Sequence, residues 1–489
     1  MQFISITFMC FFFLFFIIYH ITKKEYRYII LFIANYIFYG WNNIAAIPTL
    51  FLATLITYIG GIVLEGKKTK LLYTIFFMSS LSILVIYKYL NFLIDNVNIL
   101  SGIIEPAYAG IPILSKIDIV VPIGLSFFIF QSTSYLNDVY RKGMKAEKNF
   151  LRYAAFVSFF PTILSGPIQK SRDLLPQLTK SNDFDYTRAK QGVELLVWGF
   201  FQKIVIANRL GTIVNTVYDD YLAYDNIYYI IAAVCYSFYI YCDFSSYSDM
   251  ACGVAQILGF DVKPNFKNPY LAESIGEFWN RWHISLNAWF VENVYIPLGG
   301  KRKGTLIKYR NMFLVFFFSG IWHGASWNFI IWGVLNGILR IFGDVLQPLR
   351  IKVCDIFKIN ADNYFIRIIK KAFVFGLITL TWVFFRVSDI NVAIHIIKNM
   401  VLLYPRSLFN PEVLQIFGGN TGFGIFCVLM GIFIILQCVR REGGKIREVL
   451  KKMPEGVENI IIAIFISCCI IMACSGTTTF NTQFIYFQF

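Results

Sequence analysis

The chain has 489 residues, of which 57% are hydrophobic, 18% aromatic and only 15% charged. Soluble domains carry about 25% charged residues, and apolar runs near membrane-spanning length recur here from end to end, so the sequence excludes a soluble protein and predicts a polytopic helical membrane protein. The net charge of +15 indicates no nucleic-acid partner, because the Lys and Arg residues cluster in short links between apolar runs, where they orient the chain and meet anionic membrane lipids.

Five apolar runs open the chain, at residues 3–19, 28–41, 47–63, 71–94 and 119–136. Basic residues fill the link after the first run, the third run and the fifth run, whereas the link after the second has no charge. Because basic links stay in the cytoplasm, the N-terminus is expected outside. The first run lacks a basic residue before it and a small-residue cleavage pattern after it, so it is expected to be retained as a span.

The middle of the chain is less regular. Residues 150–166 are apolar but are interrupted by Pro161 and by Gly166, and both flanks are basic, so a re-entrant segment is predicted rather than a crossing. A span over 193–217 then leaves the cytoplasm and a span over 228–241 returns. Residues 243–311 form the longest polar region, and its alternation of aromatic and charged residues predicts a segment that lies at the interface or dips partly into the membrane.

His323 stands inside an apolar run at residues 312–342, which is too long for one untilted span and is expected to enter, bend near the histidine and return. Placing an imidazole in hydrocarbon costs free energy, so we first interpret His323 as a functional residue. The alternative is a buried histidine bonded to a backbone carbonyl, which fixes packing and does nothing else. Gly320 and Gly324 remove side-chain bulk on either side, so another backbone or a ligand can come close.

The last third predicts a span at 372–385, an interfacial amphipathic helix at 390–403 and spans at 422–439 and 460–473. About twelve crossings are expected in all, with the C-terminal end outside. The tail has no charged side chain and ends in Phe484-Ile-Tyr-Phe-Gln-Phe489. An uncharged aromatic tail outside the cell is expected to fold back into an apolar cavity.

Several motifs together resemble the membrane-bound O-acyltransferase (MBOAT) family over residues 39–386. The strongest are residues 278–286 (FWNRWHISL), 295–300 (YIPLGG) and 319–329 (SGIWHGASWNF), with further likeness at 160–167, 243–251 and 382–386. The YIPLGG element is similar to the alginate O-acetyltransferase (AlgI) branch more than to the teichoic-acid D-alanyl transfer protein DltB. One departure is Val291-Glu292-Asn293, where an Arg-Asp-Tyr-like run is expected, so the resemblance implies no role for charge at these positions.

The resemblance implies an all-α polytopic MBOAT fold, with re-entrant and interfacial helices around a central funnel. One membrane domain spans residues 1–489, made of N-terminal helices (1–148), a catalytic core (149–386), C-terminal helices (387–475) and an extracytoplasmic tail (476–489). The resemblance also implies a bacterial inner-membrane enzyme with no bound cofactor. The ten cysteines show no Cys-x-x-Cys pair and no zinc-ligand spacing, so no metal site is expected.

By the same resemblance His323 is the catalytic histidine, and neutral imidazole suits the removal of a hydroxyl proton near pH 7. His283 is the second candidate, and both catalysis and a donor-side role in shaping the funnel wall stay open. Glu277 and Arg281 are four residues apart and are expected to pair on one helix face. Trp279 and Trp282 are expected in a membrane belt. The candidate donor-binding or funnel-lining residues are Trp279, Asn280, Arg281, Trp322, Asp243 and Asp249.

The aromatic tail resembles the terminal motif of the small peptide that accompanies DltB, in which a tyrosine hydroxyl is thought to hold the acyl group. Carried over, Tyr486 is the acceptor that His323 activates; the alternative is a packing tail whose hydroxyl only finds a partner. The implied function is transfer of an acyl group, with acetyl expected, from a cytoplasmic thioester such as acetyl-CoA. A separate extracytoplasmic SGNH-type transferase would then pass it to an envelope or secreted polysaccharide. D-alanyl transfer from a carrier protein and a membrane transporter are the alternatives.

Overall fold

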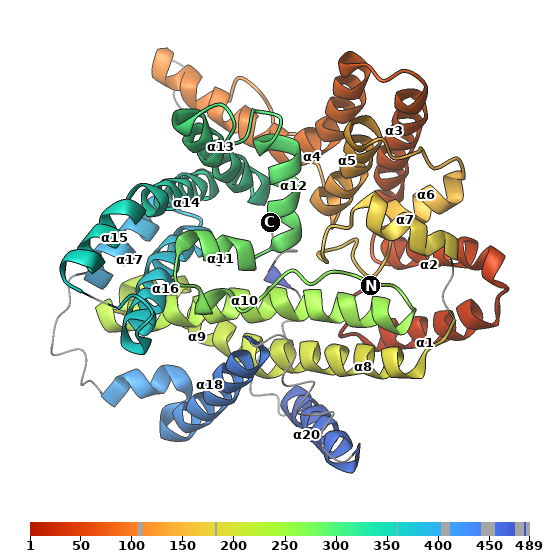
Figure 1. Ribbon diagram of the computed structural model, residues 1–489. Coiled ribbons are helices and arrows are strands. Elements are labelled where there is room, and N and C mark those ends of the chain that lie inside the picture. Colours follow the sequence, from red (N-terminus) through yellow and green to blue (C-terminus); the bar gives the residue numbers. More distant parts are fainter. Residues whose placement is uncertain are drawn as a thin grey trace.

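The computed structural model describes all residues except 106–109, 111, 181–182, 359, 402–410, 442–454, 475–483 and 486–489. The part that it describes is helical and contains no strand. Figure 1 shows the helices: α1 Ile6–Ile21, α2 Arg27–Gly40, α3 Ile47–Gly66, α4 Lys70–Ile104, α5 Leu125–Lys142, α6 Phe150–Val157, α7 Ser171–Lys180, α8 Tyr186–Phe200, α9 Asn208–Asp219, α10 Asn226–Ile257, α11 Ile275–Arg281, α12 Ile284–Phe290, α13 Thr305–His323, α14 Trp327–Val345, α15 Gln347–Ile356, α16 Tyr364–Arg386, α17 Ile390–Val401, α18 Gly419–Arg441 and α20 Glu455–Cys474.

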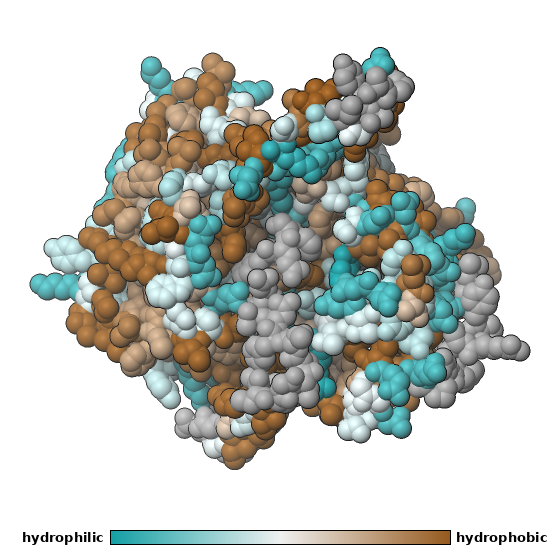
Figure 2. Space-filling view, turned by 180° about the vertical axis from the view of Figure 1, so that it is seen from behind, coloured by the Kyte–Doolittle hydropathy of each residue, from teal (hydrophilic) through white to brown (hydrophobic). Residues whose placement is uncertain are grey.

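Among the described residues, six helices are long and apolar enough to cross a membrane, namely α3, α4, α10, α14, α16 and α18. Helix α1 is apolar but has only 16 residues. Large hydrophobic side chains such as Ile6, Leu71 and Phe365 are more than two-thirds exposed, and Figure 2 shows hydrophobic residues over much of the visible face. Such a surface suits contact with lipid, so the predicted all-α membrane fold is confirmed, while the number of crossings stays a prediction.

The predicted spans match helices, but several bounds differ; α4 runs on to Ile104 instead of ending at residue 94, and α16 begins at Tyr364 instead of residue 372. Helix α5 begins at Leu125 instead of residue 119, because Gly124 takes up a left-handed conformation with φ 78°. Any side chain there would meet the carbonyl oxygen of Ile163 at 2.5 Å. Helix α10 runs on to Ile257, well beyond the predicted end at residue 241, so the motif around Asp243 lies in a buried helix and its assignment to an interfacial region is wrong.

The segment after α6 is irregular, as Pro161 and Gly166 predicted. The helix ends at Val157 and is followed by turns up to residue 166. The buried side chain of Asn35 bonds this backbone from α2: its amide nitrogen donates to the carbonyl of Ala155 at 3.0 Å, and its oxygen accepts from the N–H of Phe160 at 2.9 Å. A non-helical backbone inside a membrane protein needs such internal partners, because lipid offers none.

Helices α13 and α14 form the expected hairpin around His323. Helix α13 ends at His323, Gly324 is extended, and the side chain of Ser326 caps the start of α14 by accepting a hydrogen bond from Asn328. The two helices cross at a pair of glycines, where a Cβ on Gly320 would lie 2.4 Å from the carbonyl oxygen of Phe329 and 3.1 Å from the Cα of Gly333. The prediction that a glycine admits another backbone beside the histidine is therefore confirmed.

Replacing Gly320 with alanine should destabilise the protein by about 1–3 kcal/mol, because the new methyl group meets fixed backbone atoms. Gly343 is the matched control: it lies in α14, and a Cβ there would meet nothing within 4 Å. Gly343→Ala should be neutral or slightly stabilising, since alanine favours a helix more than glycine does. Midpoints of thermal unfolding in detergent measure both, and equal midpoints for the two variants would show that the crossing tolerates the extra bulk.

Candidate active site

His323 is held at the end of α13 inside a ring of aromatic side chains. Its side chain is buried, and its ring centroid lies 4.9 Å from that of Trp322, 5.0 Å from Trp332 and 4.9 Å from Phe385. Trp332 comes from α14 and Phe385 from α16, so three helices fix the imidazole. Because rigid rings hold it at the end of a helix, the imidazole of His323 is kept in one orientation.

His283 lies close to His323, with the indole of Trp322 between them. The ring centroids of His283 and Trp322 are 5.8 Å apart, and the edge of His283 packs on Phe244 at 4.6 Å. His283 joins α11 to α12 with a positive φ of 44°, and the next residue, Ile284, donates its N–H to the carbonyl of Asn265 at 2.9 Å. A non-glycine residue held in this conformation is uncommon and is found at functional sites more often than elsewhere.

Asp243 forms a fully buried ion pair with Lys203. The Lys203 Nζ lies 2.6 Å from Asp243 Oδ1, and both side chains are at most 1% exposed. Lys203 and its neighbour Gln202 lie in a π-helical turn, Phe201–Ala207, between α8 and α9, and Gln202 donates to Asp249 at 2.9 Å. Both carboxylates are therefore satisfied from one turn of π-helix, a form often found at functional sites.

The C-terminal tail returns to this ion pair. Phe484 and Ile485, which the structure describes, are both buried, as predicted for a tail that folds back. The N–H of Ile485 donates to Asp243 Oδ2 at 2.7 Å, and the ring of Phe484 lies 4.7 Å from the Lys203 ammonium. Tyr486 lies outside the described residues. Asp243 thus has a function that its position in the sequence did not indicate, which is to bind the backbone of the tail.

The remaining candidates fall into two groups. Trp279 and Trp282 are buried, so their assignment to a membrane belt is wrong; Trp279 packs on Trp332, which itself contacts His323. Arg281 binds Glu277 within α11, as its spacing predicted, and Asn280 is exposed on the same helix. The tryptophans belong to the aromatic wall of the site, whereas the Arg281 pair holds α11 itself together.

Two residues of α4 contact the histidine segment and were not predicted from the sequence. Lys88 donates to the carbonyl oxygens of Trp322 and His323, and Tyr89 donates to that of Ile321. The available signal was the position of Lys88 inside the predicted span at 71–94, since a lysine at membrane depth usually has a functional partner.

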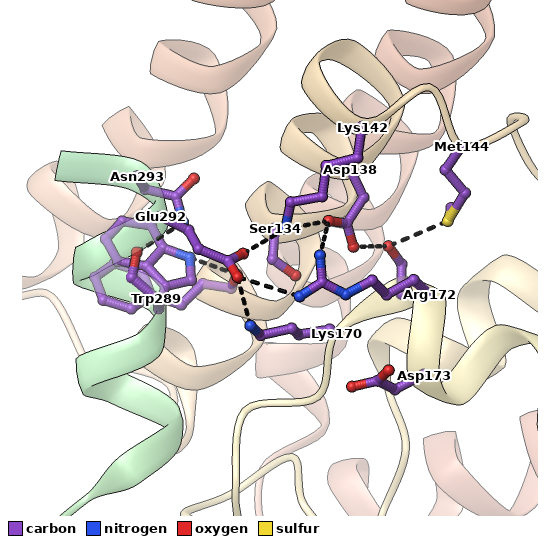
Figure 3. Close-up of polar contacts among 12 residues, drawn as sticks. Ser134, Asp138, Lys142, Met144, Lys170, Arg172, Asp173, Trp289, Glu292 and Asn293 are labelled. Carbon is purple, nitrogen blue, oxygen red and sulfur yellow. Dashed lines mark hydrogen bonds and ion pairs between the residues drawn. The ribbon is translucent and has the colours of Figure 1, made fainter. Parts of the chain in front are cut away.

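Glu292 lies at the centre of an ion-pair cluster, which Figure 3 shows in close-up. Its carboxylate binds Lys142 of α5 at 2.7 Å, Lys170 at 2.5 Å and Arg172 of α7 at 3.2 Å. Asp138 of α5 shares Lys142 and Arg172. The departure at residues 291–293 therefore does not remove charge from this position: Glu292 ties α5 and α7 to the π-helical turn Val291–Tyr295 after α12.

Aromatic stacking connects this cluster to the histidines. Trp289, at the end of α12, stacks on Phe130 with centroids 3.6 Å apart and donates its indole N–H to the Phe130 carbonyl. Phe130 in turn packs on Trp322 at 5.7 Å. Because Glu292 lies only one turn beyond Trp289, the cluster holds the helix that supports one side of the site.

The Glu292 cluster should make stability depend on pH. Burial alone would raise the pKa of Glu292, but hydrogen bonds from Lys142 and Lys170 outweigh it and hold the pKa at about 2. The pKa of Glu292 is thus lower in the folded protein than the value of about 4.3 that an ordinary glutamate has in the unfolded chain. The ionised carboxylate therefore contributes its full stability above about pH 4.3, and this contribution is lost as the pH falls toward 2. The unfolding midpoint of the wild type in detergent should therefore fall further between pH 6 and pH 3 than that of Glu292→Gln. Equal falls in the unfolding midpoint of the two proteins between pH 6 and pH 3 would contradict the stabilising role of the Glu292 carboxylate.

Within the described residues, no group of three or more His, Cys, Asp or Glu side chains is arranged to hold a metal ion. The site is instead built from two histidines, an aromatic wall, a buried ion pair and the end of the tail. Such a set can accept and return a proton in a water-poor interior and can hold a hydroxyl-bearing side chain beside it.

Comparisons with known proteins show which proteins this chain is similar to. The family model described as MBOAT, membrane-bound O-acyltransferase family, matches residues 70–388, which include both histidines. A probable alginate O-acetylase AlgI from Pseudomonas putida is 35% identical over 77% of this chain and 75% of its own length. A peptidoglycan O-acetyltransferase from Helicobacter pylori is 30% identical over 77% of this chain and 74% of its own length. A teichoic acid D-alanyltransferase from Bacillus subtilis is 31% identical, but over only 44% of this chain and 57% of its own.

Proposed function

This chain belongs to the membrane-bound O-acyltransferase family, and we propose that it carries an acetyl group across the membrane on Tyr486. The acyl donor is a cytoplasmic thioester, and acetyl-CoA is the donor that we propose. His323 activates the Tyr486 hydroxyl, and an extracytoplasmic SGNH-type transferase then moves the acetyl group to an envelope or secreted polysaccharide. The transporter alternative conflicts with the family, whose members are acyltransferases.

The observation that carries this proposal is the hydrogen bond from the Ile485 N–H to Asp243. The next residue of α10 after Asp243 is Phe244, whose ring packs on His283, and Trp322 joins His283 to His323. Tyr486 follows Ile485 directly, and one residue spans at most about 3.6 Å of chain. A tail fixed at Asp243 is therefore well suited to present a tyrosine hydroxyl to the two histidines.

The chemistry balances without a further reactant. A ring nitrogen of His323 takes the proton from the Tyr486 hydroxyl as the phenolic oxygen attacks the thioester carbonyl carbon. The carbon–sulfur bond breaks, and the departing thiolate takes the proton back from the imidazolium. The products are an acyl-tyrosine ester and a free thiol. The buried site excludes the water that would hydrolyse the ester.

Acetyl is preferred to D-alanyl as the group transferred. The relatives that match three-quarters of this chain are named for O-acetylation, whereas the D-alanyltransferase matches less than half of it. We place the enzyme in the bacterial cytoplasmic membrane, with both termini outside and the basic links, including the Glu292 cluster, on the cytoplasmic side.

Purified protein incubated with radiolabelled acetyl-CoA tests the proposal. The wild type should become labelled, and Tyr486→Phe should not. Tyr186→Phe is the control, since Tyr186 is exposed at the start of α8 and should not alter labelling. Labelling of Tyr486→Phe at the wild-type level would show that another residue receives the acetyl group. Labelling with a D-alanyl carrier thioester and not with acetyl-CoA would overturn the choice of acyl group.

A further inference from the structure

Lys88 places a cation against the backbone of the proposed catalytic residue. It lies near the middle of the 35-residue helix α4, in a candidate membrane span. Its Nζ donates to the carbonyl oxygens of Trp322 and His323, at 2.8 Å in each case. A lysine within a membrane span is costly and is retained where it serves a buried site, often with backbone carbonyls as partners.

The carbonyls concerned are ones that α13 cannot satisfy itself. The last four carbonyls of an α-helix have no partner within the helix, and a left-handed glycine often closes such an end. Gly324 is extended instead, with φ −171°. Side chains of α4 take over: Lys88 binds the carbonyls of residues 322 and 323, and the Tyr89 hydroxyl donates to the carbonyl of Ile321 at 2.7 Å.

Helix α4 also contacts the far side of the turn. Asn96 accepts a hydrogen bond from the indole N–H of Trp327, the first residue of α14, at 3.0 Å. The Lys88 ammonium further lies 5.9 Å from the ring of Trp322, the indole between the two histidines. One face of α4 thus contacts the end of α13, the indole of Trp322 and the start of α14, and the cation on this face, Lys88, binds the backbone carbonyls of Trp322 and His323.

We propose that Lys88 is a positioning residue of the acyl transfer, which orients His323 by binding the end of α13. This rests on the proposed function of His323 as the proton acceptor. An apolar side chain of the same length would pack in a membrane at less cost, but it would leave the carbonyls of Trp322 and His323 without a donor. The imidazole would then lose its fixed backbone, and a misplacement of about 1 Å can lower a rate on the order of 10²-fold.

Three variants test this by the rate of label transfer from acetyl-CoA to the enzyme. Lys88→Met keeps the length of the side chain and removes its hydrogen-bond donors. It should lower the maximal rate about 10²-fold without changing the acetyl-CoA concentration that gives half of the maximal rate. Lys88→Arg keeps the charge and the donors and should restore most of the rate. Lys116→Met is the control, because Lys116 forms an exposed ion pair with Asp95 of the same helix.

A purely structural role would lower the yield or the unfolding midpoint of Lys88→Met and leave the rate per folded molecule unchanged; that result would overturn the inference. If Lys88→Met does not fold, Tyr89→Phe tests the inference instead, because it removes only one hydroxyl. It should lower the maximal rate, and a wild-type rate would show that α4 does not orient His323. If His323→Ala is inactive and Lys88→Met is fully active, only this inference fails. If both are fully active, the proposed function itself is wrong.

Discussion

Replacing His323 with alanine should lower the rate of acyl transfer about 10²–10⁴-fold, the usual contribution of a positioned general base. The fold should survive, because the rings of Trp332, Trp382 and Phe385 remain packed on one another; for example, the Trp332 and Phe385 centroids lie 5.4 Å apart. Label transfer from acetyl-CoA to the purified enzyme measures the loss, and the unfolding midpoint in detergent monitors the fold.

The matched control is His395→Ala. His395 also lies beside aromatic residues, with its ring 5.5 Å from that of Tyr221, but it is exposed on α17 and contacts none of the site residues described above. It should keep the wild-type rate. Wild-type labelling by His323→Ala would show that His323 is not the proton acceptor. Equal losses in both variants would show that the loss is not specific to His323.

Breaking the Lys203–Asp243 pair should have the largest effect on stability. Lys203→Met leaves the Asp243 carboxylate in the interior without its counter-charge, which costs about 3–5 kcal/mol when a buried ion pair loses one partner. The double variant Lys203→Met/Asp243→Leu removes both charges and should recover most of that stability. Thermal unfolding of the two variants in detergent measures the difference.

The double variant also separates folding from tail binding. It has no carboxylate to accept the Ile485 N–H, so it should fold well and yet transfer little acyl group to the tail. A double variant with wild-type labelling would show that Asp243 has no part in holding the tail. If the double variant is as unstable as Lys203→Met, the two side chains stabilise the fold by more than the attraction between their charges.

Much of the fold could be predicted because the signals are local. Apolar runs marked the helices, Pro161 and Gly166 marked the irregular segment, and the hairpin around Gly324 followed from a run too long for one span. The pair of Glu277 and Arg281 followed from helical spacing alone. Each of these features depends on residues that are close together in the sequence.

The interior of the site could not be predicted in the same way. Asp243 and Asp249 looked like interfacial residues because carboxylates rarely lie in a buried helix. The residues that compensate them, Lys203 and Gln202, come from 40 and 47 positions earlier. Trp282 resembled a membrane-belt residue because a tryptophan next to charged residues usually lies at the interface. Its burial depends on packing between distant helices.

The most direct test of the central claim is mass spectrometry of the C-terminal peptide from the enzyme purified from its native host. We expect a fraction of the peptide to carry the mass of one acetyl group, with fragment ions that assign it to the Tyr486 oxygen, and we expect this fraction to vanish in His323→Ala. A peptide that is unmodified in an enzyme actively acetylating polysaccharide, or an acyl group attached elsewhere, would contradict transfer through Tyr486.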